Sequence, residues 1–212
     1  MLKRYTSGSW ADVEDLKRYS GGSWADCESA KRYADGTWVE VWSSAEQIPA
    51  TFQCYTNYYG AYSYTPSGTA CSVQINSLYE SLTVSGYIKI MFPRNLYRPT
   101  ITFSMKGEKS LLHAPADAGE ENIRGLIAVY VRNTETSSRT MGHTSYPAAG
   151  TEPLDITAGF NTTTNYYNCC EIALYVYGKS LGGNSYSLPS LKLDIDEILL
   201  TLNGTKYRAS FE

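Results

Sequence analysis

Five tyrosines lie within ten residues of this chain: Tyr55, Tyr58, Tyr59, Tyr62 and Tyr64. A tyrosine ring is rigid, has an apolar face and ends in a hydroxyl, so it can bind a glycan or a protein with little loss of conformational entropy. The same rings also suit the interior of a β domain. These five residues are therefore the candidate contact surface, and core packing of some of them is the alternative.

Histidine offers little for catalysis in this chain. Only two histidines occur, His113 and His143, and we expect both in loops. No pair of histidines has the spacing of a metal site, and no Gly-x-Ser-x-Gly motif is present. We therefore expect neither a metalloenzyme nor a serine hydrolase.

Paired carboxylates could instead hydrolyse a glycosidic bond. Asp117, Glu120 and Glu121 are close in sequence, but they fall in an expected long loop over 111–121, where acidic side chains are usually solvated. Glu171 and Asp155 are expected to project from strands, and the sequence does not show that they meet. We expect no catalytic residue, and glycan hydrolysis is the least favoured hypothesis.

The cysteines follow no metal-binding spacing. Neighbours such as Cys169 and Cys170 point to opposite faces of a strand, so they are not expected to bridge each other or share a metal. Free thiols are the default expectation, with a Cys54–Cys71 disulfide left open. The full set is Cys27, Cys54, Cys71, Cys169 and Cys170.

Charge and hydropathy exclude some partners. The chain has 212 residues and a net charge of −3, which disfavours nucleic acid and an anionic membrane. No stretch reaches the roughly 20 apolar residues of a transmembrane helix. The start, Met1 to Arg4, leads into a repeat rather than the apolar core of a signal peptide. We expect a protein made in the cytoplasm without a signal peptide.

Alternating apolar and polar residues predict strands after residue 45. Ile101 to Met105 and Leu191 to Ile195 alternate cleanly, and the uniformly apolar Leu126 to Val131 is expected to be central. The predicted strands cover 71–76, 86–92, 100–106, 124–132, 154–160, 170–177 and 191–202, with a linker or first edge at 46–49. Their expected separators are 65–68, 93–95, 106–108, 133–138, 148–150 and 178–189. This pattern predicts an all-β fold, an antiparallel β-sandwich of the jelly-roll type over 45–212.

Residues 2–43 repeat one 14-residue sequence three times. Each copy has two strand-like stretches around a turn-prone cluster with Gly, as in a β-hairpin. Pairing Tyr5 with Trp10 places Lys3 opposite Asp12 and Leu2 opposite Val13. The matching charge pairs in the later copies are Lys17–Asp26 and Lys31–Glu40. We therefore predict a domain of three β-hairpin repeats over 1–44.

Aromatic residues recur at fixed positions in these repeats. Stacking between copies is the favoured role, and a ladder of sugar-binding platforms is the alternative. Short hairpins are marginal alone, so we expect the repeats to assemble or anchor the chain. The residues concerned are Tyr5, Trp10, Tyr19, Trp24, Tyr33 and Trp38.

The repeats resemble the amino-terminal repeats of bacteriophage and prophage structural proteins of the tail-fibre, head-fibre and other minor virion types. The resemblance rests on Lys-Arg-Tyr, a Gly and a Trp in each copy. It implies a virion location, other virion proteins as partners, and a homo-oligomer, with a trimer favoured.

The carboxy-terminal part resembles a jelly-roll carbohydrate-binding module. The stretches Ile172 to Gly178 and Leu193 to Ile198 carry this resemblance. It implies that Asp194 or Asp196 helps to hold a structural calcium, the one cofactor considered, although no other residue completes the site.

Two functions follow as hypotheses. The first is a non-enzymatic virion structural protein of the fibre or decoration type, whose repeats anchor it and whose sandwich is displayed outward, with a host-surface glycan as a further partner. The alternative is a stand-alone carbohydrate-binding module of a bacterial surface or wall-associated protein.

Overall fold

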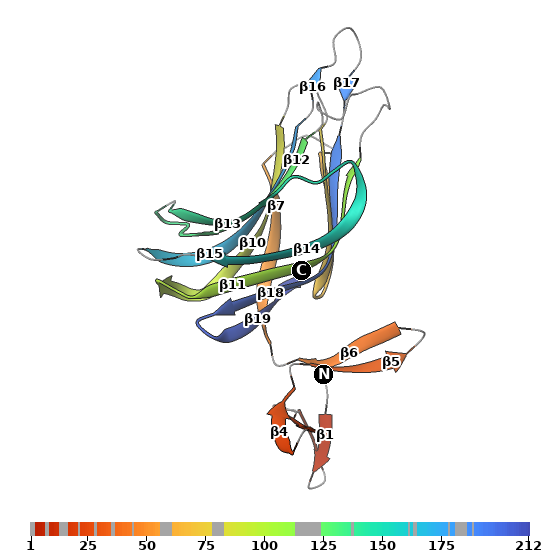
Figure 1. Cartoon of the computed structure of the whole chain (residues 1–212), viewed down its shortest axis with the longest axis vertical. Coiled ribbons are helices and arrows are strands. Elements are labelled where there is room, and N and C mark those ends of the chain that lie inside the picture. Colours follow the sequence, from red (N-terminus) through yellow and green to blue (C-terminus); the bar gives the residue numbers. More distant parts are fainter. Residues whose placement is uncertain are drawn as a thin grey trace. The chain divides into compact units, whose positions relative to one another are not determined.

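The structure is a computed structural model of the chain. It describes residues 3–6, 9–12, 17–20, 22–27, 29–34, 37–43, 45–55, 61–77, 83–112, 124–136, 138–160, 162, 165–177, 179, 180, 186, 187 and 189–212. The chain divides into two units, Met1–Glu46 and Gln47–Glu212 (Figure 1). The described residues form strands and turns, and none of them lies in a helix that could span a membrane.

The first unit consists of three separate two-stranded hairpins, and their predicted register is confirmed. Lys3 pairs with Asp12 and Tyr5 with Trp10, and the later copies repeat these pairs, including Lys17 with Asp26. The predicted Leu2–Val13 pair lies outside the described residues. The strands are β1 (Lys3–Thr6), β2 (Ser9–Asp12), β3 (Lys17–Ser20), β4 (Ser23–Asp26), β5 (Ser29–Ala34) and β6 (Thr37–Ser43).

The third hairpin differs from the first two by a bulge. Ala30 pairs with Trp42 and Lys31 with Glu40, so Val41 is an extra residue on β6. The predicted Lys31–Glu40 and Tyr33–Trp38 pairs are present. A bulge lets a hairpin lengthen without moving its turn-side pairs out of register.

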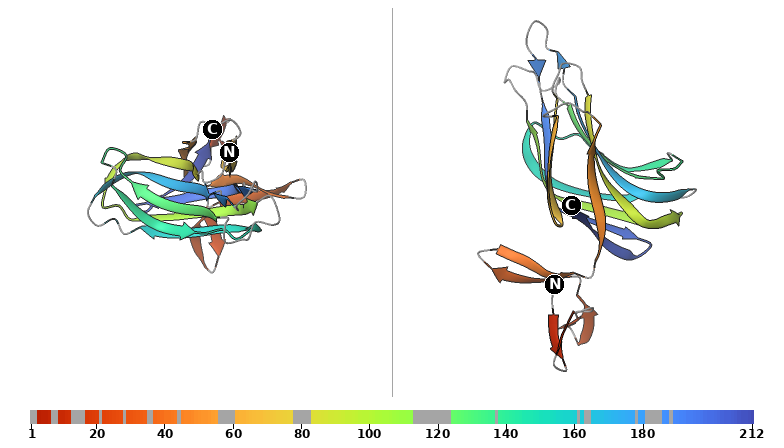
Figure 2. Two further views of the ribbon diagram at one scale, coloured as in Figure 1. Left: turned by 90° about the horizontal axis from the view of Figure 1, so that it is seen from above. Right: turned by 180° about the vertical axis from the view of Figure 1, so that it is seen from behind.

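The second unit is an antiparallel sheet of 11 strands that folds over into two layers (Figures 1 and 2). Its strands are β7 (Glu46–Cys54), β8 (Tyr62–Ser67), β9 (Ala70–Asn76), β10 (Thr83–Tyr97), β11 (Ile101–Leu112), β12 (Arg124–Arg132), β13 (Arg139–Ser145), β14 (Gly150–Phe160), β15 (Tyr166–Tyr177), β18 (Ser190–Leu202) and β19 (Thr205–Phe211). A further short hairpin pairs β16 (Lys179–Ser180) with β17 (Tyr186–Ser187). The predicted all-β sandwich is confirmed.

The order of the strands separates the two layers. One layer runs β13–β12–β15–β10–β7, and the ladder continues through β19 into β18–β11–β14. Strand β18 also pairs with β9 along its first half, and β9 pairs with the edge strand β8. The layers thus place β10 and β15 in the middle of the first layer, flanked by strands on both sides.

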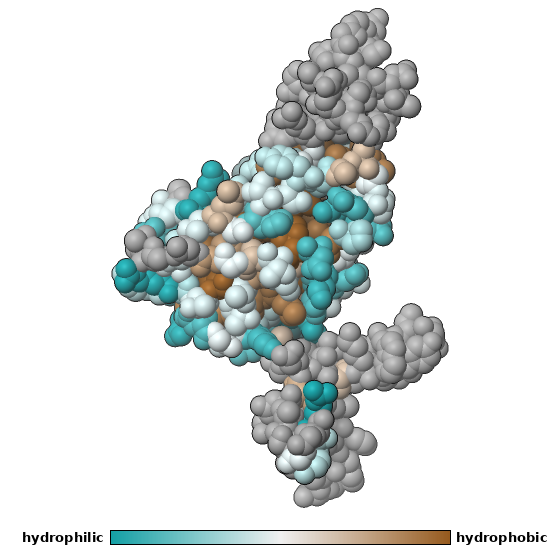
Figure 3. Space-filling model, in the orientation of Figure 1, coloured by the Kyte–Doolittle hydropathy of each residue, from teal (hydrophilic) through white to brown (hydrophobic). Residues whose placement is uncertain are grey.

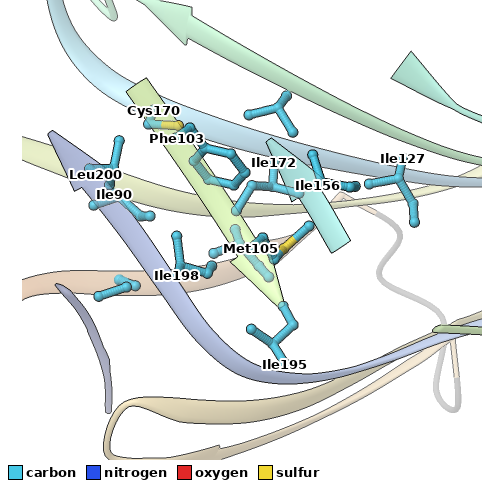
Figure 4. Close-up of a cluster of buried hydrophobic side chains, with 14 of the residues drawn as sticks. Ile90, Phe103, Met105, Ile127, Ile156, Cys170, Ile172, Ile195, Ile198 and Leu200 are labelled. Atoms are coloured by element: carbon cyan, nitrogen blue, oxygen red, sulfur yellow. The ribbon is translucent and has the colours of Figure 1, made fainter. Parts of the chain in front are cut away.

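One hydrophobic core lies between the layers (Figure 4). Phe103 and Met105 of β11 meet Ile90 of β10 and Cys170 and Ile172 of β15, and all five are buried. Along each strand the core residues occupy every second position, as expected for a strand with one face toward the core. The intervening residues of β10 and β15 therefore point away from the core.

Two expected turns are β-bulges within longer strands, so these two predictions were wrong. Pro93 to Asn95 lie inside β10, where the pairing with β15 jumps from Met91 to Leu96. Gly107 lies inside β11, where the pairing with β18 skips one residue. A bulge removes local pairing, so it tolerates Pro and Gly as a turn does, and the sequence signal is the same.

Several strands lie where the sequence predicted a loop or an edge, or where no strand was predicted. Residues 46–49 begin β7, which lies between β10 and β19 rather than at an edge. Residues 65–67 belong to β8, whose free side accommodates Pro66 because proline cannot donate to a ladder. Strands β13 and β19 were not predicted, and His143 lies in β13 rather than in a loop.

Candidate functional site

The structure divides the predicted tyrosine cluster. Tyr58 and Tyr59 lie outside the described residues. Tyr55 follows the end of β7, and its N–H donates to the carbonyl of Ser85 on β10 at 3.1 Å. Its side chain is 55% exposed. Tyr55 therefore belongs to the surface next to β10.

Tyr62 and Tyr64 lie on β8 and pack against the ring of Phe52. The ring centroids are 5.6 Å apart for Tyr62 and 5.4 Å apart for Tyr64. Tyr64 also packs against the hydrophobic core, and burial, with a smaller contribution from the Cys71 thiolate, raises its pKa. The two residues thus do not share the surface of Tyr55, and a binding role for them stays a prediction.

Tyr55, Tyr87 and Tyr175 form a row across β7, β10 and β15, which we call the tyrosine row. The rings of Tyr55 and Tyr87 meet edge to face, with centroids 5.0 Å apart and planes at 90°. The rings of Tyr87 and Tyr175 meet at 82° with centroids 5.9 Å apart, and their hydroxyls lie 2.9 Å apart. Edge-to-face contacts favour a fixed arrangement of the rings.

The alternation of β10 and β15 directs the tyrosine row outward. Ile88 and Ile90 are fully buried in the core, so Tyr87 and Lys89 point the other way. Tyr87 pairs with Ala173 of β15, which in turn pairs with Ala128 of β12. Both alanines are fully buried although they are not part of the core cluster between the layers.

Charged and amide groups accompany the tyrosine row. Lys89 donates to Gln53 Oε1 at 3.1 Å and to the Tyr55 hydroxyl at 3.4 Å. On the next strands Arg132 donates to Glu171 at 3.0 Å. We call the outward side chains of this layer the outer face: Gln53, Tyr55, Tyr87, Lys89, Glu171, Tyr175, Tyr130, Arg132 and Arg139.

The edge of the outer face ends in another aromatic residue with a cation. The guanidinium of Arg139 on β13 lies 5.1 Å from the ring centroid of Tyr130 on β12. Arginine stacks on an aromatic ring while its donors stay available to a ligand. Rings and donors therefore occur together at both ends of the outer face.

The outer face shields the groups beneath it from water. Burial, together with the hydrogen bond and charge of Tyr87 and the charge of Tyr130, raises the pKa of Tyr175, while Arg139 acts in the opposite direction. Burial and the neighbouring Glu171 raise the pKa of Cys169 to about 11, so its thiol is protonated at neutral pH. The Tyr175 hydroxyl is therefore also protonated at neutral pH.

The carboxylates considered for hydrolysis are not brought together. Glu171 lies on β15 in the first layer and is 4% exposed. Asp155 lies on β14 in the second layer, where it is exposed and pairs in register with Lys106. Asp117, Glu120, Glu121 and His113 lie outside the described residues.

His143 points toward the edge of the core. Burial, and to a smaller extent the charge of Lys109, lowers its pKa. Its Nε2 atom is buried and has no hydrogen-bond partner among the described residues. It lies apart from the tyrosine row, as its register partner Val129 belongs to the core.

The two acids considered for calcium lie on β18. Asp194 accepts hydrogen bonds from Ser72 Oγ and from Lys192 Nζ, each at 2.6 Å. Although burial opposes ionisation, these hydrogen bonds and the charge of Lys192 outweigh it and lower the pKa of Asp194. Within the described residues no group of three or more His, Cys, Asp or Glu could hold a metal ion. A calcium at Asp194 or Asp196 stays a prediction.

The aromatic residues of the repeats are described mainly by their backbone. Tyr19 is 62% exposed, whereas the side chains of Tyr5, Trp10, Trp24, Tyr33 and Trp38 lie outside the described part of the chain. Their stacking role stays a prediction. All five cysteines are free, as expected, and Cys54 donates to the Ser85 carbonyl instead of pairing with Cys71.

Sequence reasoning did not select Tyr87, Lys89 or Tyr175. A signal was present, because Tyr87 and Lys89 alternate with Ile88 and Ile90 in a predicted strand. The local pattern does not indicate which strands pair, and it is the pairing of β10 with β15 that brings Tyr175 beside Tyr87. Figure 3 shows that hydrophobic residues remain visible between hydrophilic ones on the sandwich surface, so exposed apolar atoms alone would not have identified the site.

No family model matches the chain, and no curated protein matches it in sequence. Among solved structures, the chain is similar to carbohydrate-binding modules. A mutant of a family 29 module is 12% identical, with 73% of this chain and 93% of that chain covered and a TM-score of 0.32. A family 4 module is 16% identical, with 71% and 94% covered and a TM-score of 0.38. A family 61 module in complex with β-1,4-galactotriose is 10% identical, with 74% and 91% covered and a TM-score of 0.34.

Proposed function

We propose that the chain binds a carbohydrate chain on the outer face of the β7–β10–β15–β12–β13 layer. The observation that carries this proposal is the tyrosine row, three rings in edge contact across three neighbouring strands. A sugar offers apolar C–H groups on its ring faces and hydroxyls at its edge. A tyrosine can contact both, because its apolar ring packs on the C–H groups and its hydroxyl forms hydrogen bonds with the sugar hydroxyls.

The polar groups beside the rings support the same ligand. The Gln53 amide, the Lys89 ammonium and the tyrosine hydroxyls are donors and acceptors spaced along the strands. Most are tied to one another, so they are held in place before a ligand arrives. Groups that are already ordered lose less conformational entropy on binding.

The size of the outer face favours a chain of sugars over a single ring. It extends from Tyr55 beside β7 to Arg139 on β13, with β10, β15 and β12 between them. Neighbouring strands lie about 4.8 Å apart, so four intervals span roughly 19 Å. That span exceeds one sugar ring and matches a short oligosaccharide laid across the strands.

Binding to a panel of soluble polysaccharides, measured by affinity gel electrophoresis and calorimetry, tests this proposal. Tyr55→Ala and Tyr87→Ala should each weaken the best ligand roughly tenfold or more, because each removes a ring contact. Tyr62→Ala is the matched control, since Tyr62 is an exposed tyrosine of the neighbouring β8. Circular dichroism and thermal unfolding confirm that each variant folds.

Two results would count against the proposal. If no polysaccharide of the panel binds, the outer face has another role. If Tyr62→Ala weakens binding while Tyr55→Ala and Tyr87→Ala do not, the ligand lies on β8, as the original tyrosine cluster suggested.

The hairpin repeats carry a second proposal, that the first unit assembles copies of this chain or anchors it to a larger particle such as a virion. The turn-side pairing that the three hairpins share supports it, because Tyr pairs with Trp in each of them. Isolated two-stranded hairpins are marginal in water, so they gain from assembly. Light scattering of the full chain and of residues 45–212 tests the assembly of copies: a full-length oligomer reduced to a monomer is expected. Two monomers would contradict self-assembly and would mean that the repeats bind something else.

A further inference from the structure

The charged side chains of the outer face are mostly cationic. The described residues that point outward include three cations, Lys89, Arg132 and Arg139, and one carboxylate, Glu171. The whole chain, in contrast, has a net charge of −3. The outer face therefore has the opposite sign to the chain as a whole.

Glu171 neutralises only one of the three cations. Its carboxylate accepts from Arg132 Nη1 at 3.0 Å, and the side chains are 6% and 27% exposed respectively. Lys89 is its register partner on the other side, yet the Lys89 ammonium turns toward β7 instead. Within the part of the chain that the structure describes, Lys89 and Arg139 have no carboxylate partner.

The groups around Lys89 leave its charge in place. Its ammonium donates to the neutral Gln53 amide and Tyr55 hydroxyl, and it lies 5.7 Å from the Tyr55 ring centroid. Neutral acceptors and a ring orient an ammonium without cancelling its charge. The cation is thus fixed beside the most exposed ring of the tyrosine row.

Arg139 repeats this arrangement at the other edge. It is exposed, lies over the Tyr130 ring, and has no carboxylate partner among the described residues. Strands β15 and β12 separate β13 from β10, the strand of Lys89, so three strand intervals, about 14 Å across the sheet at the usual strand spacing, separate the two strands that carry these cations. Each end of the outer face thus pairs a cation with an aromatic ring.

We propose, on the basis of the carbohydrate binding proposed above, that the ligand is an anionic polysaccharide whose acidic groups contact Lys89 and Arg139 while its sugar rings lie on the tyrosine row. The shared chemistry is an acidic group carried on a sugar chain, either the carboxylate of a uronic acid or a phosphate. A lysine point charge accepts both, and the arginine fork binds either oxyanion in bidentate fashion.

Calorimetry on the full chain at low and physiological ionic strength tests this inference. The probes are two acidic polymers, each with its neutral counterpart: polygalacturonate with its methyl ester, and phosphorylated dextran with plain dextran. Single-stranded DNA serves as a polyanion that is not a polysaccharide. One of the two acidic polymers should bind on the order of tenfold more tightly than its neutral counterpart, and the preference should decrease with salt. Tighter binding of polygalacturonate would identify a carboxylate as the acidic group, and tighter binding of phosphorylated dextran would identify a phosphate.

The variant Lys89→Gln combined with Arg139→Gln should abolish this preference. Lys106→Gln is the matched control, because Lys106 is an exposed cation of β11 in the other layer. The control removes one charge from the chain without touching the outer face, and the preference should persist.

The outcomes separate this inference from the proposed function. If acidic and neutral polymers bind equally and Tyr87→Ala weakens both, the inference is overturned while carbohydrate binding stands. If the acidic preference survives the double variant, the anion is held elsewhere, and tighter binding of single-stranded DNA than of any polysaccharide would assign the face to nucleic acid. If nothing in the panel binds, both proposals are overturned.

Discussion

The hydroxyls of Tyr87 and Tyr175 lie 2.9 Å apart although the two residues are diagonal neighbours on paired strands, Tyr87 being in register with Ala173. The small Ala173 leaves room for the two rings to approach edge to face. The contact joins residues 88 positions apart in the sequence. It places a partly buried hydrogen bond in the middle of the proposed ligand-binding surface.

This contact predicts a particular loss of stability at alkaline pH. Burial and the hydrogen bond to Tyr87 raise the pKa of Tyr175 in the folded chain. Its contribution is therefore complete below the pKa of an unfolded tyrosine, about 10, and is lost as the pH rises toward the folded pKa. The free energy of unfolding of the wild type should decrease between about pH 9 and about pH 11 more steeply than that of Tyr175→Phe.

Denaturant unfolding at several pH values measures this difference. Tyr146→Phe is the control, because Tyr146 is 70% exposed and should leave the slope of the wild type unchanged. Parallel slopes for wild type and Tyr175→Phe would show that Tyr175 is no better shielded in the folded chain than in the unfolded one.

The five free thiols should differ sharply in reactivity. Burial, followed by the charge of Asp194, raises the pKa of Cys71 to about 12, and Cys169 and Cys170 are also buried with raised pKa values. Only the half-buried Cys27 and Cys54 should react with a disulfide reagent within minutes at about pH 8, since the thiolate is the reactive form.

The number of reactive cysteines is measured by the thiolate that the disulfide reagent releases, with and without denaturant. The native chain should release two equivalents quickly and the unfolded chain five, and Cys27→Ser with Cys54→Ser should remove the fast phase. A fast third thiol in the native chain would mean that the first or second layer opens far more readily than its packing implies.

Much of the fold could be predicted because alternation is a local property. The predicted strand over 124–132 matches β12, and the hairpin registers follow from one aromatic pair per repeat. Strand β19 was predictable as well: Asn203 and Gly204 both have positive φ, 51° and 91°, in the two-residue turn that joins it to β18. An Asn-Gly pair between alternating stretches is the strongest short-range hairpin signal.

The candidate site was less predictable, because it depends on which strands become neighbours. Tyr55, Tyr87 and Tyr175 are far apart in sequence, and only the order β7–β10–β15 brings them together. Nearness in sequence favoured the run from Tyr55 to Tyr64 instead. Tyr64 of β8 packs against the core, whereas Tyr55 lies on the outer face.

The bulge at Gly107 predicts a strong dependence on glycine. Gly107 has a φ of 152°, and a Cβ there would lie 2.0 Å from the backbone oxygen of Asp194. Gly107→Ala should lower the free energy of unfolding by about 3 kcal/mol or more, since β11 and β18 would have to separate locally. Gly159→Ala on the neighbouring β14 is the matched control, because a Cβ there meets no atom within 4 Å.

Thermal and denaturant unfolding measure the free energy of unfolding of the two variants relative to the wild type. Gly159→Ala should stay within about 0.5 kcal/mol of the wild type, as expected for an exposed site without special contacts. Equal effects of the two substitutions would show that the backbone of Asp194 moves freely and that the bulge does not fix the register of β11 and β18.

The ion pair between Glu171 and Arg132 makes opposite predictions for stability and for binding. Glu171→Gln leaves the Arg132 charge largely buried without a counter-ion, and its Nε already has no partner among the described residues. We expect a loss of about 2 kcal/mol, below the value for a fully buried pair because water reaches the partly exposed Arg132. The same substitution makes the outer face more positive, so affinity for the acidic polysaccharide should increase while affinity for its neutral counterpart does not. Unfolding and calorimetry on one preparation measure both effects, and a drop in acidic affinity at preserved folding would instead identify Glu171 as a direct ligand of the sugar hydroxyls.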